Sequence, residues 1–291
     1  MIRIPSHSFD RICYAMINHY AKHHPVYGEC LFADNGIVEI GIPLEFGLRI
    51  GHFSLLGDKN VFFEQPKDME VFTTEDGWRI RGGHRLWLAP ESDLDDYCPD
   101  NDPITYRIEG DTILLTQRED PRLHIIKQFA LTFEGNHLHI SHRITNTGSA
   151  PLECALWAIS VMAPGGTETI PLQQRDGGAA HCNRISTWFY TDLGDPRVGY
   201  TRDRIVIRQT PLDQRYKIGI GHPSGPISYE NNGTVFTVEY PAIPEKTYPD
   251  GNVSYETFCS RYMLEMETLS PLSTVLPGGT LEHPETWTLI K

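Results

Sequence analysis

The sequence predicts an all-β protein, a large sandwich of two antiparallel sheets with one helix near the N-terminus. Segments rich in β-branched and aromatic residues recur along the chain, and turns separate them. A 3.6-residue apolar period, which is typical of a helix, stands out at one place. The 25 glycines and 21 prolines are spread along all 291 residues, as expected for many strands joined by short turns.

The predicted helix covers residues 8–22. Apolar side chains recur there at the i, i+3, i+4, i+7 spacing that makes one stripe: Phe9, Ile12, Cys13, Met16, Ile17 and Tyr20. Ser8 can cap the start of the helix, and Pro25 follows its end. We therefore expect residues 1–27 to form a helical extension.

The predicted strands follow this extension. They lie near residues 36–44, 111–120, 122–133, 136–146 and 152–162. In the fourth segment, Leu138, Ile140 and His142 alternate with polar residues, which is typical of a half-buried strand. Gly135-Asn136 separates two strand patterns and predicts a hairpin turn. Residues 28–291 are expected to form a single sandwich domain.

Composition argues against several classes of function. A formal net charge of −13 disfavours nucleic acid as a partner. No run of 18 apolar residues predicts a membrane span, and the N-terminal residues do not resemble a secretory signal, so a cytoplasmic location is expected. No P-loop, GxSxG, GxGxxG or HExxH motif occurs, and no cofactor is indicated. The sequence carries no signal of oligomeric state.

The segment RGGHRLWLAPE, residues 81–91, is a candidate sugar subsite. Two glycines precede His84, and Arg81, Arg85 and Trp87 surround it. Arginine and histidine donate to hydroxyl oxygens, and an indole ring offers a flat apolar face to a pyranose. The alternative is a structural strand with a core tryptophan and a histidine that bonds a backbone carbonyl.

A second candidate is the run RYMLEMETLSPL near the C-terminus. Glu265 and Glu267 are two residues apart, so both should project from the same face of one strand. Two neighbouring carboxylates repel each other unless they bind hydroxyls or a cation, or face open solvent. Met263 and Leu269 flank them on that face, which argues against a plain solvent face.

Histidines offer a third possibility, a metal site. His137 and His139 share one face of a predicted strand, a geometry that zinc can use. No carboxylate recurs beside them in a ligand pattern, and lone strand histidines are usually structural. We therefore expect no metal.

Taken in order, these segments resemble the galactose mutarotase-like superfamily over roughly residues 28–291. The resemblance implies a β-supersandwich fold. LEMETLSPLSTVLPGGTLEH is similar to the segment that holds the catalytic glutamate, which implies that Glu265 is the base. RGGHRLW is similar to the segment with a substrate histidine, which implies that His84 and Arg81 lie in the site. The opening strands of the family end in an Asn near the cleft, here Asn60.

The sequence departs from the family at one point. Active aldose mutarotases carry a general-acid histidine in the strand after an Asn-containing turn, whereas residues 155–166 contain none. A positioned general acid contributes roughly 10²- to 10⁴-fold in rate. Ordinary mutarotase activity is therefore expected to be weak.

Two functions remain open. In the first, the protein is a sugar 1-epimerase with Glu265 as base and His84 as acid or sugar-positioning residue. In the second, it only binds a sugar: Trp87 and Trp157 stack on the ring, while Glu267, together with Glu265 and Asn60, holds its hydroxyls. A structural domain without a ligand is a third alternative, since a sandwich supports many functions.

Overall fold

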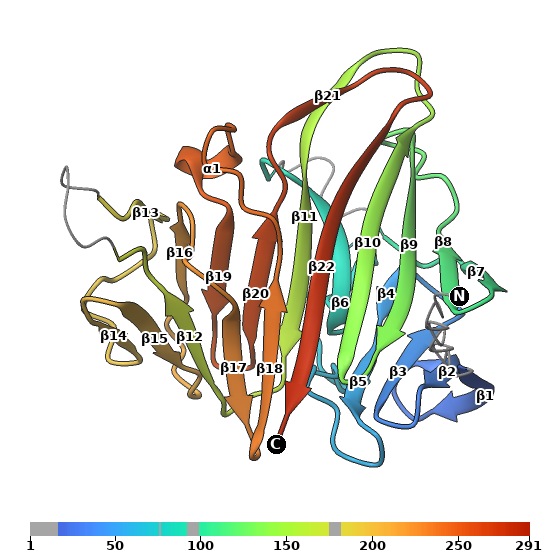
Figure 1. Ribbon diagram of the computed structural model, residues 1–291, viewed down its shortest axis with the longest axis horizontal. Coiled ribbons are helices and arrows are strands. Elements are labelled where there is room, and N and C mark those ends of the chain that lie inside the picture. Colours follow the sequence, from blue (N-terminus) through green and yellow to red (C-terminus); the bar gives the residue numbers. More distant parts are fainter. Residues whose placement is uncertain (1–16, 76, 92–98, 175–181) are drawn as a thin grey trace, which may run out of the picture.

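The computed structural model describes residues 17–75, 77–91, 99–174 and 182–291. These residues form three antiparallel sheets and one short helix, α1 (Pro249–Asn252) (Figure 1). The predicted all-β sandwich is confirmed. No helix in the described ranges has the length and apolarity needed to cross a bilayer.

The largest sheet has ten strands. In spatial order they are β14 (Val198–Tyr200), β15 (Arg204–Arg208), β12 (Thr167–Pro171), β17 (Ile227–Asn231), β18 (Thr234–Glu239), β22 (Thr280–Ile290), β10 (His137–Asn146), β9 (Ile125–Glu134), β8 (Thr112–Thr116) and β7 (Thr105–Glu109). The hairpin predicted at Gly135-Asn136 is confirmed, because Glu134 of β9 pairs with His137 of β10. Gly135 has a φ of 59°, a conformation that glycine adopts without steric cost.

The second large sheet positions the candidate site. Its strands are β13 (Ile185–Thr187), β16 (Tyr216–Ile220), β19 (Tyr255–Cys259), β20 (Leu264–Leu269), β11 (Leu152–Met162), β6 (Gly83–Ala89) and β4 (Arg49–Ile50), with β21 (Ser273–Val275) paired to β11. In Figure 1 the central strands of both large sheets run in similar directions, as in an aligned sandwich.

The main hydrophobic core lies between the two large sheets. Leu86 of β6, Met266 of β20 and Trp287 of β22 belong to it. A second, smaller core covers the other face of the eight-stranded sheet and includes Trp157 and Ile159 of β11. Because both faces of this sheet are covered, every residue of β20 is buried, its two glutamates included.

The third sheet contains β1 (Asn18–His24), β2 (Gly28–Asp34), β3 (Val38–Pro43) and β5 (His52–Leu55). The part of the predicted helix up to residue 16 lies outside the described residues. From Asn18 onward the helix prediction is wrong, because Asn18–His24 pairs along its whole length with β2. Tyr20, expected in an apolar helix stripe, is 41% exposed as a residue, and its hydroxyl donates to Glu39. Pairing with an available strand edge has overridden the local apolar period.

Candidate functional site

A cleft of about 630 Å³ opens on the face of the eight-stranded sheet that points away from the sandwich interior. Strands β6, β11, β16, β19 and β20 supply its floor, and the segments around residues 72–80 and 188–190 supply its walls. Pockets of roughly 300–1,000 Å³ are the usual size for small-molecule sites. The alternation of side chains along each strand decides which residues reach the cleft.

An ion pair lies at the floor of this cleft. Arg85 of β6 donates from Nη2 to Oε1 of Glu265 on β20 at 3.0 Å, and the two residues are 4% and 8% exposed. The Arg85 guanidinium lies 4.6 Å from the centroid of the Trp87 ring, in a cation–π contact. Nε and Nη1 of Arg85 are buried and have no hydrogen-bond partner among the described residues. Arg85 therefore has two donors that the described residues leave unsatisfied.

A second charged group lies beside the first. The Lys217 ammonium is 2.8 Å from Glu256 Oε2 and 3.0 Å from Glu267 Oε2, and Glu267 also accepts a hydrogen bond from the Trp157 indole at 2.9 Å. Burial would lower the pKa of Lys217, but the two carboxylates outweigh it and the pKa is raised. Burial raises the pKa of both glutamates. Lys217 therefore stays charged, and Glu256 and Glu267 share its single positive charge.

Aromatic rings surround these charges. Trp78, Trp87, Trp157 and Trp188 all line the cleft. The Trp87 and Trp157 rings meet edge to face, with centroids 5.7 Å apart. The cleft thus combines flat apolar walls with a floor of hydrogen-bonding charges, a combination suited to a ligand with both kinds of surface.

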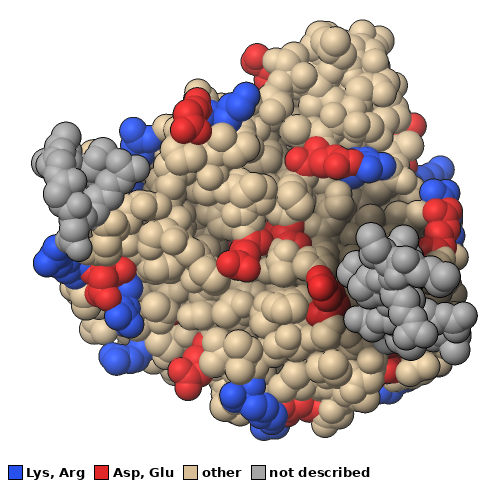
Figure 2. Space-filling model, in the orientation of Figure 1, with Lys and Arg blue, Asp and Glu red and all other residues tan. Residues whose placement is uncertain are grey.

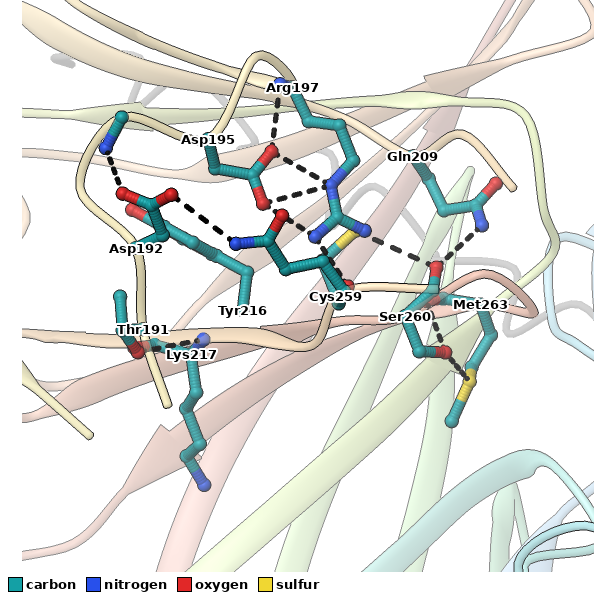
Figure 3. A network of polar contacts seen from close by, with 12 residues as sticks. Thr191, Asp192, Asp195, Arg197, Gln209, Tyr216, Lys217, Cys259, Ser260 and Met263 are labelled. Carbon is teal, nitrogen blue, oxygen red and sulfur yellow. Dashed lines mark hydrogen bonds and ion pairs between the residues drawn. The ribbon is translucent and has the colours of Figure 1, made fainter. Parts of the chain in front are cut away.

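A polar network holds the 188–190 wall against β16 (Figure 3). Thr191 Oγ1 donates to the Lys217 carbonyl at 2.5 Å, and the Lys217 N–H donates back to Thr191 Oγ1 at 3.3 Å. Farther along the segment, Arg197 and Asp195 form a buried ion pair with 2.7 Å between Nη2 and Oδ2. Arg197 also donates to the backbone carbonyl of Gln214, just before β16. These contacts fix the wall to the same strand that carries Lys217.

The expected partnership between His84 and Glu265 is wrong. Alternation along β6 turns His84 into the sandwich interior, where it is fully buried, while its neighbour Arg85 faces the cleft. His84 Nδ1 lies 2.9 Å from Ser160 Oγ, and His84 Nε2 lies 2.7 Å from His142 Nε2. Burial and the neighbouring His142 hold the pKa of His84 well below its usual range. His84 therefore bonds polar groups inside the sandwich.

Arg81 and Asn60, expected to bind substrate, do not line the cleft either. Arg81 stacks on the Phe46 ring at 3.9 Å and donates to Asn101. The Asn60 side chain closes a local turn: its Oδ1 accepts from the Phe53 N–H at 2.9 Å. The predicted residues that do come together in or beneath the cleft are Arg85, Trp87, Trp157, Glu265 and Glu267.

Two side-chain groups within the described ranges have the spacing of metal ligands: His84, His142 and Glu285 inside the sandwich, and His24, His52 and Glu64 at the third sheet. In the first group, the His142 Nδ1–H donates to the His283 carbonyl, so a neutral His142 accepts at Nε2 from the Nε2–H of His84. In the second group, His24 Nδ1 accepts from the N–H groups of Val26 and Tyr27, which leaves the ring proton on Nε2. Hydrogen bonds thus account for these nitrogens.

Sequence reasoning missed Lys217 and Trp188. Lys217 is the one charged residue of β16, YKIGI, in which all five residues are buried. A lone charge within a buried strand needs a partner, and this signal was available from the sequence. Trp188 lies between short, weakly patterned strands, and nothing near it in the sequence indicates that it reaches the cleft.

No protein-family model matches the sequence, and a search of curated proteins finds no match. Solved structures do match. A galactose mutarotase-like protein from Lactobacillus casei has a TM-score of 0.60 at 11% identity, over 90% of this chain and 100% of that one. Another, from Clostridium acetobutylicum, has a TM-score of 0.55 at 9% identity, over 94% and 99%. A galactose mutarotase related enzyme from Lactobacillus acidophilus has a TM-score of 0.54 at 8% identity, over 94% and 98%.

The protein therefore has the galactose mutarotase-like fold. The resemblance read from the C-terminal segment and from RGGHRLW is confirmed at this level, and the sheet order described above shows how the fold is built. At these sequence identities the likeness concerns the fold alone. The function has to be argued from the cleft itself.

Proposed function

We propose that the protein binds a carbohydrate in the cleft of the eight-stranded sheet. The observation that carries this proposal is the placement of the Arg85–Glu265 pair beside the Trp87 ring, in a cleft that Trp157 and Trp188 also line. A pyranose has two kinds of surface: C–H faces that stack on aromatic rings, and hydroxyls that need donors and acceptors. The cleft offers both within a few ångströms.

In this proposal, Arg85 and Glu265 hold the sugar hydroxyls. Nε and Nη1 of Arg85 are unpartnered donors among the described residues, and the Glu265 carboxylate is an acceptor on the same side of the sheet. These two nitrogens are closed to solvent, so in this proposal the Arg85 side chain turns toward the cleft when a sugar binds, and a sugar oxygen then accepts from it.

The charges favour a neutral sugar over a polyanion. The net charge is −13, and acidic side chains occur even at the centre of the face drawn in Figure 2, where basic side chains lie mainly near the periphery. The two buried cations of the cleft already contact carboxylates: Arg85 contacts Glu265, and Lys217 contacts two. Arg215, which also lines the cleft, is exposed and lies 5.0 Å from the Tyr190 ring. A strongly acidic ligand would meet these carboxylates at short range.

Calorimetric titration with a panel of neutral aldoses, uronic acids and sugar phosphates tests the proposal. Glu265→Gln keeps the size of the side chain but weakens it as an acceptor, and should lower the affinity at least about tenfold, or about 1.4 kcal/mol. The matched control is Glu282→Gln, which changes an exposed carboxylate paired with Arg143 and should leave affinity unchanged. Absence of binding across the panel, or equal affinities for wild type and Glu265→Gln, would contradict the proposal.

A second candidate is sugar 1-epimerase activity at the same residue. Glu265 lines the cleft, and in this candidate its carboxylate removes the proton from the anomeric hydroxyl. The C1–O5 bond then breaks, the ring oxygen gains a proton, and the ring recloses as the other anomer. Protonation of the ring oxygen needs a general acid, and no histidine is among the described residues that line the cleft. Burial raises the pKa of Tyr190, which does line it, to about 12.

Line-exchange NMR on the same panel separates the two candidates. An epimerase should exchange anomers faster than buffer, and Glu265→Gln should abolish the exchange while keeping the sugar affinity within about tenfold. Exchange at the buffer rate in the wild type would leave carbohydrate binding as the function. Fast exchange that survives Glu265→Gln would mean that another group is the base.

A further inference from the structure

Four of the protein's five tryptophans line the one cleft described above. Trp78 comes from the segment before β6, Trp87 from β6, Trp157 from β11, and Trp188 from the segment after β13. The fifth, Trp287, is buried in the sandwich core. Residues separated by 110 positions in the sequence have thus been brought to one cleft.

The rings form a continuous run along the cleft. The Trp78 and Trp87 centroids are 5.7 Å apart, and the Trp87 and Trp157 centroids are again 5.7 Å apart. The run continues through Lys217, whose Nζ lies 4.5 Å from the Trp157 ring and 4.7 Å from the Trp188 ring. Trp78 and Trp157 are each only 4% exposed, so the tryptophan rings with surface to offer a ligand are those of Trp87, on β6, and Trp188, on the segment after β13.

The run extends beyond Trp188 onto the rim. The Phe189 side chain is 95% exposed, and its ring lies 5.1 Å from that of Tyr190. Both residues line the cleft. Exposed aromatic residues beside a cleft are typical of binding surfaces, and the hydrogen bonds of Thr191 hold this rim in place (Figure 3).

We propose that the cleft takes a glycan of two or more linked sugar units. One unit lies over the Arg85–Glu265 pair against Trp87, and the next unit lies against Trp188 and Phe189. This inference rests on the proposed carbohydrate binding and names its ligand class. The volume of about 630 Å³ supports it, because a single pyranose is at the small end of the ligands that such pockets enclose.

The test is a comparison of chain lengths. Glucose, galactose, mannose, xylose and N-acetylglucosamine are titrated as monosaccharides and as linear oligosaccharides of two to four units, by calorimetry and tryptophan fluorescence. For the sugar that binds, the affinity of the trisaccharide should exceed that of the monosaccharide at least about tenfold. Trp188→Ala and Phe189→Ala should remove this gain, so that each variant binds one and three units with similar affinity.

Leu193→Ala is the matched control, since Leu193 follows in the same segment, is 61% exposed and does not line the cleft. It should keep the gain with chain length. Thermal unfolding of each variant shows that the fold is intact. Equal affinity for one and three units would overturn the extended site and leave carbohydrate binding standing. Loss of monosaccharide binding in Trp188→Ala would overturn it as well, because Trp188 would then belong to the first subsite. Absence of binding by every sugar would overturn both proposals.

Discussion

Nη2 of Arg85 lies 3.0 Å from Oε1 of Glu265, although their strands, β6 and β20, are not neighbours in the sheet. Strand β11 lies between β6 and β20 and pairs with both, and its Ile159 is opposite Arg85 while its Val161 is opposite Glu265. The ion pair therefore spans the intervening strand diagonally. Long side chains on the same face of a sheet can make such contacts.

Because Arg85 and Glu265 form an ion pair, substitutions at the two residues should have non-additive effects on the free energy of unfolding. Arg85→Met leaves the Glu265 carboxylate without its cation at a site where the side chain is 11% exposed, and should lower the free energy of unfolding by about 2–3 kcal/mol. Combining Arg85→Met with Glu265→Leu removes both charges and should recover more than half of that loss. Urea unfolding of the wild type, the two single variants and the double variant measures the coupling. Additive losses would contradict it.

His84 should matter for folding and not for the cleft. His84→Gln removes a fully buried ring that bonds Ser160 and His142, and should cost about 1–3 kcal/mol of stability. Sugar affinity should stay within about twofold of wild type, because the side chain faces away from the cleft. Glu265→Gln differs in that it should reduce sugar affinity as well as stability, since it removes a carboxylate that lines the cleft and pairs with Arg85. If the His84→Gln protein is stable but no longer binds sugar, this prediction is wrong and His84 belongs to the binding site.

Lys217 should stabilise the folded protein by pairing with the two buried glutamates beneath the cleft, Glu256 and Glu267. Lys217→Met leaves Glu256 and Glu267 buried without a cation, which should cost about 3 kcal/mol at pH 8. Burial raises the pKa of both glutamates above their unfolded values, so this loss should shrink toward pH 5 as they bind protons. Urea unfolding at the two pH values measures it, with Lys246→Met as an exposed control. If Lys217→Met loses the same unfolding free energy at pH 5 and pH 8, the loss does not come from the unpaired charges of Glu256 and Glu267.

Glu168 should make the protein less stable at alkaline pH. Burial raises its pKa from 4.5 to about 8, although Tyr255 and Thr257 donate hydrogen bonds to it and lower the pKa in part. Its stabilising contribution is therefore complete below pH 4.5 and is lost as the pH rises through 8. Glu168→Gln should be more stable than wild type at pH 9 by at least about 1 kcal/mol. Thermal melts of wild type and Glu168→Gln between pH 6.5 and 9 test this prediction. It is wrong if the melting temperatures of the two proteins change equally with pH.

Local sequence patterns determined the strands and the faces within them. Alternation placed Glu265 and Glu267 on one face of a strand, and β20 has them there. Alternation along RGGHRLW also requires His84 and Arg85 to face opposite ways, so the family resemblance and the strand period were in conflict at His84. The strand period was correct, because successive side chains in a strand project to opposite faces.

The tertiary structure decided which side chains, far apart in the sequence, come into contact on one face of a sheet. The pairing of β11 with both β6 and β20 brought Arg85 to Glu265, and the packing of the 188–190 segment on β16 brought Trp188 to Lys217. The same kind of long-range pairing made Asn18–His24 a strand against β2 where an apolar period had predicted a helix. The sequence by itself determined an all-β sandwich and the facing of its side chains, since those depend on neighbours along the chain. The cleft was decided by strand order and register, because both depend on residues far apart in sequence.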